Sequence, residues 1–161
     1  MKRLSLTFAV KDIADRAGDI TAVLGASRAN EEGNVLFEQL ALTGDDYLVV
    51  CHAVVEAATE IENRCMGYMP EVRLLRETDS DLLREVSFVF VVPDDGVDTM
   101  AMPLNECVMS FLVYYLVGYW LRMKLPEECE GYLLQAEGCL SKVFSLLHRR
   151  ERGVKRGYRL Y

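Results

Sequence analysis

The side chains that catalysis would need are scarce in this sequence. It contains two histidines, and the first, His52, directly follows Cys51 within an apolar stretch. A cysteine and a histidine can act as nucleophile and base, but neighbouring residues on a helix point in different directions and do not make that contact. The second, His148, precedes Arg149 at a predicted helix end, where a cation is favourable. An enzyme would need a pocket that gathers His52 with acidic groups, so both histidines are interpreted as packed or surface residues.

Two short acidic segments contain the oxygen ligands that a hard cation prefers. One is "TDSD", with Asp79 and Asp81, and the other is "PDDGVD", with Asp94, Asp95 and Asp98. Neither has the spacing of a calcium-binding loop, which also needs a closing glutamate. The chain has no glycine-rich phosphate-binding motif, no GxSxG and no HExxH. We interpret these aspartates as solvated turn residues, and the sequence predicts no enzyme, no metal site and no cofactor.

The charge is distributed unevenly along the chain. A length of 161 residues fits a single domain spanning 1–161, and the net charge is −7. The last thirteen residues carry +5, which leaves −12 on the rest; their basic members are Arg149, Arg150, Arg152, Lys155, Arg156 and Arg159. An acidic body with a basic end indicates docking onto a partner. The preferred partner of this tail, residues 149–161, is an acidic protein surface, aided by Tyr158 and Tyr161. The alternative is non-specific contact with nucleic acid.

The cysteine content and the hydropathy indicate the cellular compartment in which the protein is expected. Five cysteines occur without a CxxC pair, and no apolar secretory segment follows the N-terminus, so we expect a reducing cytoplasm without disulfides. The longest apolar run, residues 109–121, would form about 20 Å of helix, whereas a bilayer core requires roughly 30 Å. This run is therefore interpreted as a buried helix, with no membrane as partner.

The hydrophobic periodicity predicts a mainly α (α+β) fold of four to five helices. Residues 4–10 alternate as in a short strand, and helices are expected over 10–24, 35–42, 43–67, 103–123 and 126–148. Thr43 is the expected N-cap of the long central helix. Its apolar face is predicted to consist of Leu48, Cys51, Val55, Ala58, Ile61 and Cys65. Between this helix and the C-terminal helical hairpin, residues 72–77 and 86–92 predict one antiparallel β-hairpin.

The helix over 103–123 is apolar on nearly all sides. Tyr114, Tyr115, Tyr119 and Trp120 cannot all face one direction, because consecutive helical residues lie about 100° apart. We expect it to pack on the last helix and on the helix from residue 45. Two interpretations of its remaining surface stay open and do not exclude each other. It is either a central helix or one that lines a subunit interface, where tyrosine and tryptophan are enriched.

The order of these features resembles the small neck and tail proteins of double-stranded DNA phages, Bacteroidales prophages in particular. The resemblance covers residues 43–161 and is carried by "VSFVFVVPDD", "ECVMSFLVYYLVGYWLRMKLPEECEGYLLQAEGCLSKVFSLLHRR" and "GVKRGYRLY". It implies a non-enzymatic virion subunit, a head–tail connector (neck adaptor) or tail-completion protein, made in the bacterial cytoplasm. Such subunits form homo-oligomeric rings around the DNA channel and contact neighbouring portal, connector or tail proteins. The acidic body is expected to repel the DNA that passes through such a ring.

The candidate interface residues follow from this resemblance. The edge of the β-hairpin and the aromatic helix are expected to contact other subunits, through Val86, Phe88, Phe90, Tyr115, Tyr119 and Trp120. The tail is expected to dock through Arg149, Arg150, Arg152, Lys155, Arg156, Tyr158, Arg159 and Tyr161. The alternative is a small cytoplasmic regulatory protein that buries an apolar ligand or a partner helix against Tyr115, Tyr119 and Trp120. It predicts a monomer or dimer with a pocket at these residues.

Overall fold

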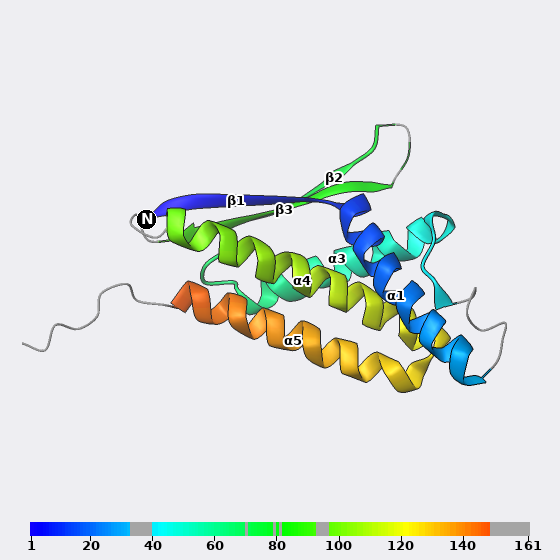
Figure 1. Cartoon of the computed structure of the whole chain (residues 1–161). Helices are drawn as coiled ribbons and strands as arrows, with labels where there is room; N and C mark the ends of the chain where they lie inside the picture. The colour runs from blue at the N-terminus through cyan, green and yellow to red at the C-terminus, as the bar shows by residue number, and fades with distance from the viewer. Residues whose placement is uncertain (33–39, 70, 79, 81, 93–96, 149–161) are drawn as a thin grey trace, which may run out of the picture.

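The computed structural model describes the whole chain except residues 33–39, 70, 79, 81, 93–96 and 149–161. The described part is a helical body with a small antiparallel sheet, as expected from the sequence (Figure 1). Its elements in chain order are β1 (Lys2–Ala9), α1 (Val10–Glu32), the 3₁₀ turn η1 (Gly44–Asp46), α3 (Tyr47–Arg64), β2 (Glu71–Arg76), β3 (Leu83–Val92), α4 (Val97–Lys124) and α5 (Pro126–His148).

The sheet joins the predicted hairpin to the first strand. β2 and β3 pair antiparallel as predicted, and β1 pairs antiparallel with the other side of β3, so the strand order is β1-β3-β2. The register places Leu6 and Val72 on either side of Phe88. Because side chains alternate along a strand, one face of the sheet is apolar and packs on the helices. The other face carries polar contacts such as the 2.8 Å hydrogen bond between the Thr7 and Ser87 hydroxyls.

The expectation that Val86, Phe88 and Phe90 form a hairpin edge is wrong. All three side chains are fully buried, at 0% exposure, in the core between the sheet and the helices. The reason is the pairing of β1 with β3, which makes β3 the central strand. The hairpin strand that keeps an outer edge is β2, in which four of the six residues are exposed.

Helix α4 is the centre of the helical body. It packs against α5, α1 and α3 and also touches β1, and Figure 1 shows it between β1 and α5. The predicted contacts with the last helix and with the helix from residue 45 are confirmed. The central-helix interpretation of its apolar surface is confirmed as well, since the helix is buried on most sides. Gly118 lies so close to α5 that an added Cβ would be 2.7 Å from Cγ and Cδ2 of Leu133.

Two helix boundaries differ from the sequence-based prediction. α1 continues to Glu32 instead of ending at residue 24, and α4 begins at Val97, so Pro103 lies inside the helix instead of in its first turn. Proline is favoured in the first turn because it lacks an N–H, but packing outweighs that preference here: Met100, which precedes Pro103, is buried in the core. Of the helix expected over 35–42, residues 35–39 lie outside the described residues.

Helix length does not by itself distinguish α4 from a membrane span. Within the described residues, one segment, Thr99–Lys124, is long and apolar enough to cross a bilayer by length and composition alone. Half of its most apolar window is buried inside the molecule. The core helices of many water-soluble domains pass the same test, so burial is the informative observation.

Two buried hydrogen bonds fix the segment that leads into η1. The Thr21 hydroxyl, fully buried on α1, accepts the Leu42 N–H at 3.0 Å and can donate to the Ala17 carbonyl at the same distance. Trp120 Nε1 donates to the Leu40 carbonyl at 2.8 Å. The segment is thus attached to α1 and to α4, because both buried backbone groups depend on these side chains for a partner.

Candidate functional site

The largest hollow described is a groove of about 960 Å³ at the end of the molecule where β1 passes into α1. It is bounded by the first turns of α1, by the segment that leads into α3 and by the β2–β3 hairpin. Its size is at the upper end of the roughly 300–1,000 Å³ typical of ligand pockets. The lining residues are Ala9, Lys11, Ala14, Asp15, Gly18, Asp19, Leu42, Thr43, Gly44, Tyr47, Glu77, Leu82, Arg84 and Glu85.

The groove combines an acidic rim with apolar patches. Asp15 and Asp19 are exposed and lie one turn apart on the same face of α1, while Glu77 and Glu85 come from the hairpin. Among the described lining residues, Lys11 and Arg84 are the cations, and four carboxylates against these two leave the described lining net acidic. The apolar part of the lining includes Ala14, Leu42 and Leu82. Such a surface suits a basic segment that also carries apolar side chains.

Two local contacts shape the groove. Thr43 donates its backbone N–H (3.0 Å) and its hydroxyl (2.9 Å) to the Asp46 carboxylate. Thr43 is therefore the N-cap of the 3₁₀ turn η1, whereas the N-cap of α3 itself is Asp46 and not the predicted Thr43. Tyr47 donates its hydroxyl to the Leu83 carbonyl at 2.7 Å, which connects the start of α3 to β3. Burial raises the Tyr47 pKa, with smaller contributions from Cys51 and Glu77, so Tyr47 remains a donor at neutral pH.

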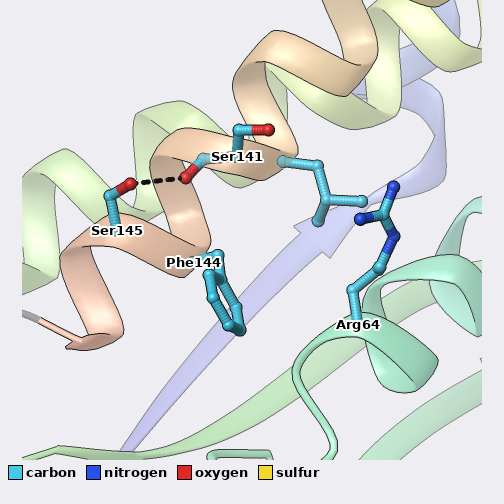
Figure 2. A pocket seen from close by; sticks show the side chains of 5 residues that line it. Arg64, Ser141, Phe144 and Ser145 are labelled. Atoms are coloured by element: carbon cyan, nitrogen blue, oxygen red, sulfur yellow. Dashed lines mark hydrogen bonds between the residues drawn. The ribbon is translucent and has the colours of Figure 1, made fainter.

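A second, smaller hollow of about 310 Å³ lies between α3 and α5 (Figure 2). Arg64 reaches into it from α3, opposite Phe144 on α5. Its guanidinium bonds to Glu60 (3.2 Å) and to Glu137, and these two bonds raise the Arg64 pKa. The Ser145 hydroxyl donates to the carbonyl of Ser141 at 2.8 Å, within its own helix. Because two carboxylates neutralise Arg64, this hollow is poorly suited to an anion.

A third hollow of about 380 Å³ contains the candidate catalytic pair. Cys51 and His52 both line it, with Arg76 as its only other charged or titratable member among the described lining residues; the others are Leu48, Val55, Leu82 and Leu83. An enzyme would require acidic groups around His52, and these lining residues include none. No group of three or more potential metal ligands occurs among the described residues. Asp79, Asp81, Asp94 and Asp95 lie outside the described residues.

The aromatic residues of α4 lie outside the three described hollows. Trp120 is buried, donates to the Leu40 carbonyl, and carries Lys124 Nζ 5.0 Å from its ring centroid. The Tyr115 hydroxyl reaches the Glu56 carboxylate at 3.4 Å, and Tyr119 is half-buried. None of the three hollows is lined by these aromatic residues. The tail residues predicted to dock, Arg149, Arg150, Arg152, Lys155, Arg156, Tyr158, Arg159 and Tyr161, lie outside the described residues.

The groove is the feature that the sequence did not reveal. Its lining comes from four separate segments, which only the fold brings together. One signal was present: Asp15 and Asp19 have the spacing that places two acids on one face of the predicted first helix.

The fold and its hollows define a mainly helical protein with a three-stranded sheet and an open, net acidic groove. Comparison with protein-family models, with curated proteins and with solved structures finds no match to this chain. Its function is therefore inferred from its own geometry and charge.

Proposed function

We propose that this chain is a non-enzymatic structural subunit that assembles with copies of itself, as a head–tail connector or tail-completion protein of a double-stranded DNA phage. The observation that carries the self-assembly is the β2–β3 hairpin, which projects from the helical body (Figure 1). Its outer strand, β2, presents Leu74 and Leu75 at 39% and 52% exposure. An exposed edge strand with apolar side chains is a ready site for pairing with another chain.

The phage context rests on the resemblance of residues 43–161 and on the charge distribution. A ring subunit in this position is made in the bacterial cytoplasm and becomes part of the virion, next to portal, connector or tail proteins. The residues before the tail carry −12, and a negative surface repels the phosphates of DNA inside a channel. Tight binding of duplex DNA to the assembled body at low salt would contradict this part of the proposal.

The regulatory alternative requires a pocket or an interface at Tyr115, Tyr119 and Trp120. The three hollows lie elsewhere, and the Trp120 indole is occupied by the Leu40 carbonyl. No observation therefore favours a ligand site at these residues over the structural role.

Native mass spectrometry over a range of protein concentrations tests the proposal. We expect a closed oligomer of defined stoichiometry, and we expect Leu75→Lys to weaken it because a lysine on an edge strand discourages pairing. The matched control is Leu134→Lys on α5, which places the same change at an even more exposed leucine, 67% accessible, away from the hairpin. A monomer at every concentration would refute the proposed self-assembly.

A further inference from the structure

The groove and the end of α5 lie at opposite ends of the molecule. β1 runs from the end where α5 finishes to the end where α1 begins, and the groove is at the latter end (Figure 1). α5 stops at His148, and thirteen further residues follow it in the sequence. Each copy therefore has the end of α5 at one end and the groove at the other.

The tail and the groove have complementary charges. The described residues of the groove lining include four carboxylates and two cations, whereas the tail has six basic residues and one acidic residue. Asp15 and Asp19 are exposed on α1, where a docked chain can reach them. Complementary charges of this kind select the partner and set the rate of encounter.

The apolar groups are complementary as well. The tail contains Tyr158, Leu160 and Tyr161, and the groove lining includes the half-buried side chains of Ala14, Tyr47 and Leu82. Tyrosine is a common anchor of protein interfaces, because one side chain supplies both apolar area and a hydrogen bond. The basic residues would position the segment, and the terminal aromatics would fix it.

We infer that the basic tail of one copy docks in the acidic groove of the next copy, head to tail. This inference rests on the proposed self-assembly and names its contact. Thirteen extended residues reach at most about 45 Å, and α5 alone is about 35 Å long. To reach its own groove, a tail would have to run almost fully extended past the whole body. A neighbouring copy imposes no such constraint, and a head-to-tail contact between identical copies closes into a ring when the rotation between them permits.

Two charge-reversed full-length variants test the contact. The groove-reversed variant carries Asp15→Lys and Asp19→Lys. The tail-reversed variant carries four changes, because two would leave the tail net positive: Arg152→Glu, Lys155→Glu, Arg156→Glu and Arg159→Glu. For each variant alone, we expect the concentration of half-assembly to rise at least tenfold at low salt. The concentrations of half-assembly of the variants and of the original chain should become more similar near 1 M salt, because salt screens exposed charge contacts. Circular dichroism and thermal melts verify that both variants are folded.

Mixing the two variants is the decisive step. The basic tail of the groove-reversed chain fits the acidic groove of the tail-reversed chain, and the acidic tail fits the basic groove. We therefore expect the mixture to form oligomers that contain both chains at protein concentrations at which neither variant assembles alone. The matched control for the groove reversal is Glu62→Lys with Glu130→Lys. It changes the net charge by the same amount as the groove reversal, at exposed sites outside the described groove lining, and it should assemble like the original chain.

The outcomes separate this inference from the proposed function. If the original chain assembles and the groove reversal leaves it unchanged, the docking contact is wrong while self-assembly stands. If the mixture stays unassembled, or if assembly appears only when duplex DNA is added, docking between copies is also refuted. A monomer at all concentrations refutes both the contact and the self-assembly.

Discussion

Replacing Gly118 by alanine tests whether the α4–α5 contact governs stability. The new Cβ would lie 2.7 Å from Cγ and Cδ2 of Leu133 and 3.4 Å from its backbone nitrogen, so Leu133 or the helix must move. Overpacking of this kind costs about 1–3 kcal/mol. Alanine recovers about 0.5–1 kcal/mol relative to glycine in a helix. We expect a net loss of about 1 kcal/mol of unfolding free energy, measured by urea denaturation, and a melting temperature about 2–4 °C lower.

Gly138 provides the matched control for this substitution. It also lies in a helix, α5, but no atom would come within 4 Å of an added Cβ. Gly138→Ala should therefore stabilise the protein by about 0.5–1 kcal/mol, since only the helix propensity changes. Adding Leu133→Ala to Gly118→Ala removes the clash, so the effects of the two substitutions should be non-additive. If both glycine-to-alanine variants stabilise equally, the close approach of the two helices is refuted.

Three further predictions concern buried groups. Trp120→Phe removes the donor to the Leu40 carbonyl and should cost about 1–3 kcal/mol in chemical denaturation, because a buried acceptor loses its partner. Thr21→Val should cost a similar amount of about 1–3 kcal/mol, since the Leu42 N–H loses its acceptor. Burial raises the pKa of Cys65 to about 11, above the ordinary value of 9.0. The folded state therefore retains the Cys65 proton longer than the unfolded state, and stability should fall as pH rises from 9 to 11, on the order of 2 kcal/mol.

Each of these predictions has a control. Tyr119→Phe changes a neighbouring aromatic residue for which no hydrogen bond is recorded among the described residues, and it should change stability by less than about 0.5 kcal/mol. Thr21→Ser keeps the hydroxyl and should retain most of the stability lost in Thr21→Val. Cys65→Ala should flatten the loss of stability between pH 9 and 11. An equal pH dependence in that variant would show that other groups cause the loss.

The fold class could be predicted because each element has a strong local signal. The hairpin sequences are rich in β-branched and aromatic residues, and the charge at the ends of α5 matches its dipole. The pairing of β1 with β3 had no local signal, since it joins segments far apart in the chain. For that reason the sequence could indicate a hairpin but could not show which of its strands would keep a free edge.

The face of α3 illustrates a second limit of sequence patterns. The predicted face is correct in its second half, where Ala58, Ile61 and Cys65 are buried. In its first half Leu48 is 66% exposed, and the buried row there contains Ala53 and Ala57. Both rows have helical spacing, so periodicity alone cannot choose between them. Small alanine side chains leave room for a neighbouring helix to approach, which favours the observed row. The groove could not be predicted from sequence patterns either, because it forms only when α1, the segment before α3 and the hairpin come together in the fold.

The pairing of the first strand with β3 also determines when the chain can fold during synthesis. β1 pairs with residues that extend to Val92, so the sheet cannot be completed until that residue has left the ribosome. At about 5–20 residues per second, β1 waits on the order of 4–15 s for its partner. Bringing together strands so distant in sequence also carries a large loop-closure cost. β1 therefore pairs late, and a nascent chain that stops before β3 lacks the strand with which β1 pairs in the folded protein.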